Sequence, residues 1–325
     1  MRYLESGSTD PAFNLALEQY AFDTLSPDGE VFMLWQNRDC VIVGLHQNTE
    51  EEINRGFIDK NNIPVIRRLS GGGAVFHDLG NLNFTFITNE PDIDRLSFDR
   101  SRRHIADALS ALGVPVKFSG RNDMTVDGKK FSGSARYFRD GRLMHHGTLL
   151  FDSDLEKMSE ALRVSDDKLV SKGIKSIRSR VTNLSGYTNM TAAEFQAFLR
   201  ESVAGDMPAY TLSERDCEAV GAIRRERYSS WDWNYGHSPE FSVIKRRRID
   251  GFGAIRIRMS AENGKITDFA TDGDYFGSRP YSDVASALRG VRLERNALLD
   301  ALRGIALWEY YDGLAADELA GLILE

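Results

Sequence analysis

The spacing of apolar residues predicts helices and strands over most of the chain. The first helix is marked most clearly, because Asp10 suits the position that caps a helix and Pro11 suits its first turn. Apolar residues then recur close to one stripe from Phe13 to Leu25. Further helices are predicted at residues 50–62, 98–112, 155–162, 191–203, 213–228, 281–288, 293–303 and 314–324.

Alternation of apolar and polar residues marks the strands. Residues 81–88 alternate around Leu82, Phe84 and Phe86, which predicts a half-buried strand. The Asp-Gly pairs at 127–128 and 140–141 suit two-residue hairpin turns, because both turn positions need a positive φ. Other strands are predicted at 31–36, 40–44 and 64–69, in a three-stranded meander over 124–152, and at 241–248, 253–259 and 265–270, the last two joined by an Asn-Gly turn.

A change in pattern near residue 229 predicts two domains. Residues 229–240 are aromatic and polar without periodicity, which is typical of a linker. Strands and then helices follow it, as in a compact α+β unit. We therefore expect a large domain over 1–240 and a small α+β domain over 241–325.

Composition supports this organisation and excludes several classes of protein. At about 150 residues per domain, 325 residues suggest two domains. The net charge of −7 disfavours general binding to nucleic acid or anionic membranes. No apolar run approaches the roughly 20 residues of a membrane helix, and the N-terminus lacks the apolar core of a signal peptide. Two cysteines cannot form a disulfide scaffold. We expect a reduced, cytoplasmic protein.

The densest chemical signal is the segment RRLSGGGAVFHD at residues 67–78. Consecutive glycines can curl backbone N–H groups around anionic oxygens, and the preceding arginines add positive charge. A flexible turn with arginines in solvent is the plainer alternative. The segment matches neither GxGxxG nor GxxxxGK[ST], so a nucleotide here would bind in another way.

Two later segments carry further candidates. Lys130 in KFSGSA has small neighbours that admit a ligand, so it is either a surface lysine or a cation for an acyl carboxylate or an α-phosphate. Asp123 in GRND is either a turn residue or a Mg²⁺ ligand. His145 and His146 would point to opposite faces of a strand, so at most one can face a site. No histidine or cysteine pattern supports a structural metal.

Together these segments resemble the lipoate–protein ligase family over nearly the whole chain. The family's motifs stand here in the same order as RRLSGGGAVFHD running into LGNLNFTF (67–86), GRND (120–123), KFSGSA (130–135), HHGTLL (145–150) and KGIKSIRSRVTNL (172–184). Several ordered motifs are far more specific than any one of them. The segment at 229–240 resembles the family's linker, and 241–325 its accessory domain.

The resemblance implies a fold and a reaction. The large domain would have the catalytic fold of biotin protein ligases and class II aminoacyl-tRNA synthetases, a mixed sheet with flanking helices. The enzyme would use ATP and Mg²⁺, without a bound prosthetic group, to convert lipoate to lipoyl-AMP. It would then transfer the lipoyl group to a lysine of lipoyl domains in 2-oxoacid dehydrogenase acyltransferase subunits or of the glycine-cleavage H protein. A monomer is the simplest expectation.

The resemblance also assigns residues. Lys130 matches the catalytic lysine that contacts both lipoate and nucleotide. Residues 172–184 match a loop that closes over the adenylate, although a solvated basic loop is the plainer reading. The remaining expected contacts are Arg68, Gly73, Ala74, Val75, Phe76, Asn122 and Asp123 for ATP, with Asp123 also for Mg²⁺, and Trp35, Arg68 and His77 for lipoate.

Two other functions stay open. A cysteine-dependent acyltransferase without ATP would need a thiol facing the acyl site, yet Cys40 and Cys217 both look like packing residues. A non-catalytic lipoate- or carrier-binding protein would be expected to have lost the lysine or the glycine run, and both are intact. The basic run at residues 245–248 either steers an acidic partner or is a solvated strand edge.

Overall fold

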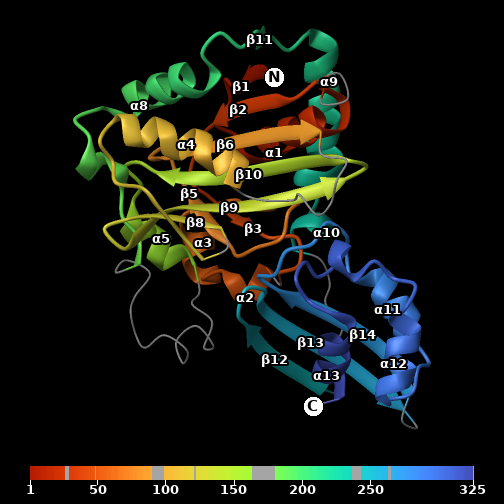
Figure 1. Cartoon of the computed structure of the whole chain (residues 1–325). Helices are drawn as coiled ribbons and strands as arrows, with labels where there is room; N and C mark the ends of the chain where they lie inside the picture. Colours follow the sequence, from red (N-terminus) through yellow and green to blue (C-terminus); the bar gives the residue numbers. More distant parts are fainter. Residues whose placement is uncertain are drawn as a thin grey trace.

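The computed structural model describes residues 1–25, 29–47, 49–89, 99–120, 122–162, 180–235, 243–262 and 265–324. Within them, an eight-stranded mixed sheet with the order β11-β1-β2-β6-β10-β9-β8-β7 forms the centre of the large domain (Figure 1). β1 pairs in parallel with β2 and β11, and the remaining neighbours are antiparallel. The strands are β1 (Arg2–Glu5), β2 (Val31–Trp35), β6 (Asn81–Asn89), β7 (Lys117–Ser119), β8 (Asp123–Val126), β9 (Lys129–Arg139), β10 (Arg142–Leu150) and β11 (Ala209–Tyr210).

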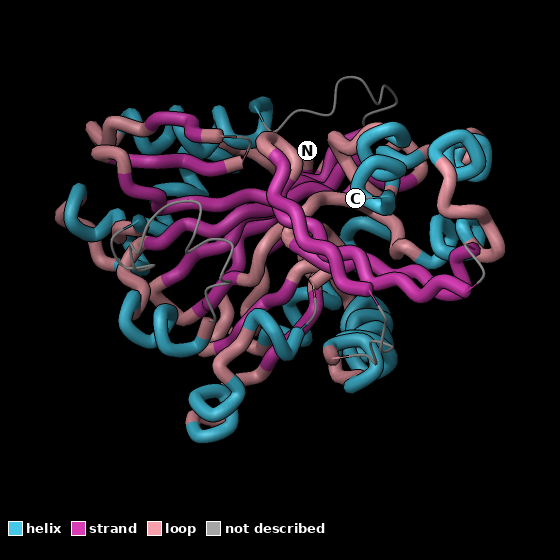
Figure 2. The backbone as a smooth tube through the Cα atoms, turned by 90° about the horizontal axis from the view of Figure 1, so that it is seen from below, coloured by secondary structure: helices cyan, strands magenta, loops and turns pink. Residues whose placement is uncertain are grey.

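Helices cover both faces of this sheet, as the view from below also shows (Figure 2). Leu17 and Val220 pack with Met33 on one face, whereas Leu109 and Phe195 pack with the other. The predicted helices are confirmed, with 50–62 divided in two. They are α1 (Pro11–Tyr20), α2 (Thr49–Glu52), α3 (Arg55–Lys60), α4 (Asp99–Ala111), α5 (Leu155–Ala161), α8 (Ala192–Leu199) and α9 (Glu214–Ile223), with π-helical turns at Ala21–Leu25, Arg200–Ala204 and Arg224–Tyr228 and a 3-10 turn at Leu184–Tyr187. Sequence reasoning missed the short helix α10 (Trp231–Asn234), which lies in the predicted linker. No helix of the described part is long and apolar enough to cross a membrane.

The prediction that β6 is half-buried is wrong. Its residues 81–88 are all buried, because helices cover both faces of the sheet. Phe84 and Phe86 enter the apolar core under α4. Thr85 points the other way and donates to the carboxylate of Glu18 on α1, with 2.6 Å between the oxygens. The alternation therefore separates an apolar interior from a polar interior rather than core from solvent.

The meander is confirmed as β8-β9-β10, and its turns have the predicted geometry. Asp127 and Gly128 have φ of 49° and 74°, and Asp140 and Gly141 have φ of 53° and 72°. These values place both turn residues in the left-handed region that two-residue hairpins require. The turns fix the register that brings Lys130 at the start of β9 opposite Thr125 of β8.

A second, three-stranded sheet with the order β4-β3-β5 lies beside the first. β2 and β3 are neighbours in sequence but belong to different sheets, so the chain crosses between the sheets after Trp35. The small sheet packs against α3 and α5 through Val41, Ile58 and Met158. Its strands are β3 (Cys40–Val43), β4 (Val65–Arg67) and β5 (Val75–His77).

The C-terminal domain is an antiparallel sheet of order β12-β13-β14 with helices against it. It has its own apolar core, which includes Ile257, Leu298 and Leu319. The expected boundary at 240/241 and the turn at 263–264 lie outside the described residues, so both stay predictions. The elements are β12 (Val243–Ile249), β13 (Gly253–Glu262), β14 (Lys265–Gly273), α11 (Ser282–Leu288), α12 (Arg295–Leu302), the 3-10 turn Leu307–Glu309 and α13 (Ala316–Leu324).

His46 joins the two domains. Its ring stacks on Tyr275 with centroids 4.6 Å apart, and its carbonyl oxygen accepts from the N–H of Gly273 at 2.8 Å. Burial, reinforced by the charges of Arg67 and Arg68, lowers the pKa of His46 to about 3. This contact therefore contains a neutral imidazole at ordinary pH.

Replacing Gly141 by Ala should lower the free energy of unfolding by about 1–2 kcal/mol, because a side chain is strained in the left-handed region. A Cβ at Gly141 would meet nothing within 4 Å, so the substitution tests backbone strain without a steric clash. Gly186 is equally open and has no positive φ, and Gly186→Ala serves as the control. Urea unfolding measures both; equal effects would contradict the assigned turn geometry.

Acidification should destabilise the protein through His46. The histidine pKa is about 6.5 in an unfolded chain and about 3 here. Between these values the unfolded state binds more protons, so the free energy of unfolding falls as the pH drops from about 6.5 towards 3. His46→Phe keeps a ring on Tyr275 and should make this slope shallower, while buried His77 continues to contribute to it. His104→Phe, at an exposed position, is the control and should leave the slope unchanged. Urea unfolding at several pH values measures the slope, and an unchanged slope in His46→Phe would refute the argument.

Candidate functional site

Two neighbouring cavities lie around the start of β9. The larger has a volume of about 330 Å³ and the smaller about 200 Å³. Ala74, Val75, Lys130, Gly133 and Thr148 line both of them. Lys130 therefore faces both cavities from a wall that they share.

The structure gathers all the predicted site residues on the walls of these cavities. Phe76 lines the smaller cavity, together with Ala74, Val75 and Lys130. The larger cavity is lined by Trp35, Arg68, Gly73, Ala74, Val75, His77, Asn122, Asp123 and Lys130. Their placement is a finding, and their individual roles stay predictions.

Lys130 is held between a carboxylate and a glycine. Its ammonium nitrogen lies 2.7 Å from Asp123 Oδ1, and both side chains are about one-third exposed, at 38% and 33%. A Cβ at Gly133 would lie 2.8 Å from Lys130 Nζ, so the glycine leaves room for the lysine. The carbonyl oxygen of Lys130 accepts from the N–H of Thr182 at 2.9 Å. The described end of the predicted loop 172–184 is thus attached at Lys130, and 172–179 lie outside the described residues.

Arg68 shapes the glycine run from inside. Its guanidinium donates to the carbonyl oxygens of Gly71 and Gly73 at 2.6 and 2.9 Å, and to Ser70 Oγ at 3.1 Å. Burial lowers the pKa of Arg68 to about 10, which still leaves it charged at neutral pH. Because its donors hold the loop's carbonyl oxygens, Arg68 fixes the loop's conformation at the cavity wall.

The first two glycines contact the C-terminal domain, which differs from the predicted anion cradle. The N–H of Gly72 donates to the carbonyl oxygen of Tyr275 at 3.0 Å. A Cβ at Gly71 would lie 2.3 Å from that same oxygen, and a Cβ at Gly72 would lie 2.7 Å from Phe276. Close approach of a second domain therefore requires glycine at both positions. Gly72 and Gly73 also line the larger cavity, whereas Gly71 is not among its lining residues.

Arg67 does not supply charge to the site. Its guanidinium donates to the carbonyl oxygens of Gly44 and Gln47 and to that of Trp233 in α10. The arginine therefore ties the segment before the C-terminal domain to the β3–α2 connection. The expectation that both arginines face an anion is wrong for Arg67, because neighbouring residues of an extended chain point in opposite directions.

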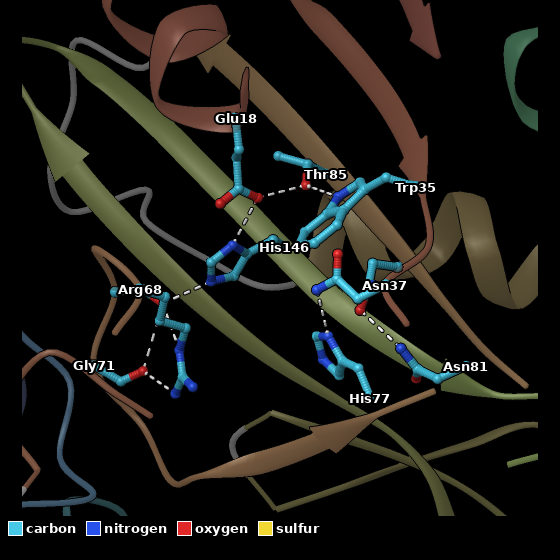
Figure 3. A network of polar contacts seen from close by, with 11 residues as sticks. Glu18, Trp35, Asn37, Arg68, Gly71, His77, Asn81, Thr85 and His146 are labelled. Atoms are coloured by element: carbon cyan, nitrogen blue, oxygen red, sulfur yellow. Dashed lines mark hydrogen bonds and ion pairs between the residues drawn. The ribbon is translucent and has the colours of Figure 1, made fainter. Parts of the chain in front are cut away.

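A chain of buried polar contacts crosses the floor of the larger cavity (Figure 3). Trp35 Nε1 donates to Thr85 Oγ1 at 3.0 Å, and Thr85 donates to Glu18. Glu18 Oε1 lies 2.8 Å from His146 Nδ1, and His146 Nε2 lies 2.6 Å from Ser70 Oγ. The carboxylate of Glu18 lies beside Nδ1 of His146 and therefore favours the tautomer with its proton on Nδ1. In that tautomer Nε2 is an acceptor, and the hydroxyl of Ser70 donates to it. This order links the floor to the Arg68 loop.

His146 faces the cavity and His145 packs into the opposite face, as strand alternation predicted. Sequence reasoning did not select between the two histidines, and it missed Glu18 and Thr85. Nothing local marks Glu18, because its partner His146 lies 128 residues away in the sequence. The polar residues of β6 were the sequence signal that could have indicated Thr85, because Asn83, two positions earlier on the same face of the strand, lines the cavity.

His77 and Asn122 have structural partners as well as places on the cavity wall. His77 Nδ1 lies 3.1 Å from the amide of Asn37, and burial lowers the His77 pKa to about 3, so the ring is neutral. Asn122 donates from its side chain to the carbonyl oxygen of Ser134 at 2.7 Å. In the described residues, no group of three or more His, Cys, Asp and Glu is placed to hold a metal.

The C-terminal domain also reaches the larger cavity. Arg248, Gly253, Asp274 and Phe276 line it. Sequence reasoning selected Arg248 only as part of the basic run at 245–248 and missed the other three, because no motif links the two domains. Among the described lining residues of both cavities there is no cysteine. Cys40 is buried, which raises the pKa of its thiol, and Cys217 is exposed on α9.

Comparison with known proteins gives matches along both domains. Residues 10–204 match the lipoyl protein ligase A/B catalytic domain, and residues 238–323 match the bacterial lipoate protein ligase C-terminus. Lipoate-protein ligase LplJ of Bacillus subtilis is 42% identical, over 97% of each chain.

Solved structures agree. P. falciparum LipL1, in complex with lipoate, has a TM-score of 0.79 at 24% identity over 99% of both chains, which shows the fold. The bi-partite lipoate protein ligase of Thermoplasma acidophilum, solved in a study with its E2 lipoyl domain, has a TM-score of 0.65 at 28% identity over 74% of this chain and 98% of its own. A lipoate-protein ligase A bound with ATP has a TM-score of 0.63 at 26% identity over 72% of this chain and 98% of its own. On the matches to both domains and to the Bacillus relative, the chain belongs to the lipoate–protein ligase family.

Proposed function

We propose that the chain is an ATP-dependent lipoate–protein ligase. It activates lipoate to lipoyl-AMP with release of pyrophosphate, then transfers the lipoyl group to a lysine of a carrier domain. The observation that carries the proposal is the position of Lys130 on both cavities. An acyl-adenylate has an apolar acyl half and a nucleotide half, and the mixed anhydride between them would lie beside this lysine.

The lining of each cavity supports one half of that intermediate. Leu15, Trp35 and Ile42 line the larger cavity and suit the alkyl chain and dithiolane of lipoate. Phe76, Leu150 and Met158 line the smaller cavity and suit the flat base of a nucleotide. Gly73, Ala74 and Val75 run past the junction, where backbone amides can meet phosphate.

Lys130 is the proposed catalytic residue. In the first half-reaction a carboxylate oxygen of lipoate attacks the α-phosphorus of ATP, and the bond to pyrophosphate breaks. The ammonium group stabilises charge that develops on the α-phosphate oxygens, in a site already arranged for it. In the second, the acceptor amine attacks the acyl carbonyl carbon and AMP leaves. Arg68 holds the glycine loop in shape for both.

The remaining parts of the proposal concern metal and partners. Mg²⁺ commonly takes one or two carboxylates together with substrate phosphates, and Asp123 offers one carboxylate at this position. We infer that Mg²⁺ arrives with ATP and that Asp123 turns to it when Lys130 contacts the phosphates. The acceptors would be lipoyl domains of 2-oxoacid dehydrogenase acyltransferase subunits and the glycine-cleavage H protein. The enzyme would act as a cytoplasmic monomer with domains at 1–240 and 241–325.

Lys130→Ala should abolish the burst of pyrophosphate that wild type releases with ATP, Mg²⁺ and lipoate in the absence of carrier. Loss of one preorganised donor to a developing charge lowers rates by roughly 100- to 1,000-fold. Lys129→Ala, at the exposed neighbouring position, is the control and should behave as wild type. A wild-type protein that transfers acyl groups without ATP would contradict the ligase assignment.

Cys40→Ala and Cys217→Ala should each retain pyrophosphate release and acyl transfer. Neither thiol lies on the described cavity walls, and burial of Cys40 disfavours its thiolate. Both activities are measured beside thermal unfolding, so that a destabilised variant is recognised. A folded Cys40→Ala protein with no activity would instead support a cysteine-dependent acyltransferase.

A further inference from the structure

The side chains of the basic run at residues 245–248 point in different directions, because the run lies on the strand β12. β12 is an outer strand of the C-terminal sheet, and its side chains alternate between the two faces. Lys245 points towards α13, where its ammonium group donates to the carbonyl oxygen of Ile323 at 2.5 Å. Arg248 instead lines the larger cavity of the other domain. The run is therefore more than a solvated strand edge.

Arg248 is aimed by a fixed carboxylate. Its Nη1 lies 3.4 Å from Asp274 Oδ2, while Asp274 Oδ1 accepts from the N–H of Ala254 at 2.5 Å. Gly253 has a φ of 120°, and a Cβ there would lie 2.7 Å from Asp274 Oδ1. The turn between β12 and β13 thus makes room for the carboxylate. A guanidinium has five N–H donors, so one long ion pair leaves donors for oxygens of a ligand.

The Arg248–Asp274 pair stands against the wall where phosphate is expected. A Cβ on Gly73 would lie 3.8 Å from Asp274 Cβ. Lys130 and Asp123 line the same cavity from the large domain. Two cations, each beside an aspartate and each from a different domain, therefore face one space. One cation is enough to neutralise a ligand with a single carboxylate. A triphosphate beside that carboxylate carries more negative charge and needs more cations to neutralise it.

We propose that Arg248 is a further catalytic residue, which binds the β- and γ-phosphates of ATP and stabilises the departing pyrophosphate. This inference rests on the proposed ligase function. As the bond from lipoate oxygen to α-phosphorus forms, the bond from α-phosphorus to the bridging oxygen breaks, and its electron pair leaves with pyrophosphate. Arg248 neutralises that charge without proton transfer, for which a permanently charged, forked guanidinium is suited.

The test separates the two half-reactions in full-length Arg248→Ala, Arg248→Lys and Arg246→Ala. Arg246 is the matched control, because it lies on the same strand and face but does not line the cavity. Pyrophosphate release is measured with ATP, Mg²⁺ and lipoate. Transfer is measured from synthetic lipoyl-AMP to a lipoyl domain, a step that involves no pyrophosphate.

We expect Arg248→Ala to slow pyrophosphate release by roughly 10- to 1,000-fold, within the range for removal of one donor or cation at a developing charge. Transfer from lipoyl-AMP should stay within about twofold of wild type. Arg248→Lys should recover part of the loss, and inhibition by added pyrophosphate should weaken in Arg248→Ala. Arg246→Ala should match wild type throughout.

Equal pyrophosphate release by wild type and Arg248→Ala would overturn the assignment of Arg248. Equal slowing of both half-reactions would also overturn it, because it indicates a structural role. A wild-type protein that releases no pyrophosphate would overturn the proposed function itself and this inference with it. The wild-type measurement thus distinguishes the two failures.

Discussion

A buried positive charge organises the centre of this molecule. Arg68 is 6% exposed, and the cost of burying its guanidinium is offset by hydrogen bonds to the glycine loop and to Ser70. Ser70 continues through His146 to Glu18, so a buried negative charge from α1 completes the arrangement. Removal of Arg68 or of Glu18 would leave the other group buried and charged. Its remaining hydrogen bonds would not offset the cost of burying that charge.

This arrangement places two requirements on the same short loop. On one side its carbonyl oxygens face Arg68, and on the other its N–H and bare Cα atoms receive Tyr275 and Phe276. The loop is therefore at once a wall of the cavity and the seat of the C-terminal domain. The contact with the C-terminal domain and the wall of the cavity therefore share one short backbone segment.

Much of the fold could be predicted from local chemistry. Asp10 accepts from the N–H of Ala12 and caps α1 as expected, and the Asp-Gly turns adopt the positive φ values that favour such pairs. The residues of the site were found because motifs mark them. Burial of β6 on both faces could not be predicted, since Asn83 and Thr85 look like solvent-facing residues until a polar interior is known to exist.

Other features depend on contacts that no local pattern contains. Arg67 and Arg68 are adjacent and chemically identical, yet one anchors α10 and the other the glycine loop. The pairing of Glu18 with His146 needs the whole order of the sheet. Arg248 and Asp274 line the cavity only because the C-terminal domain packs against the large domain, and no local pattern predicts that packing. Local sequence gives the parts of such a site, and packing between distant segments decides which parts face one another.

The two aspartates on the cavity walls have a consequence for selectivity. Asp123 and Asp274 act as internal counterions of Lys130 and Arg248, so the resting site carries little excess positive charge. Binding an anion is then an exchange of one partner for another rather than a gain of new attraction. A monoanion can displace one aspartate and gains little by doing so. A polyphosphate can replace both at once, and the freed carboxylates become available to the cation that accompanies it.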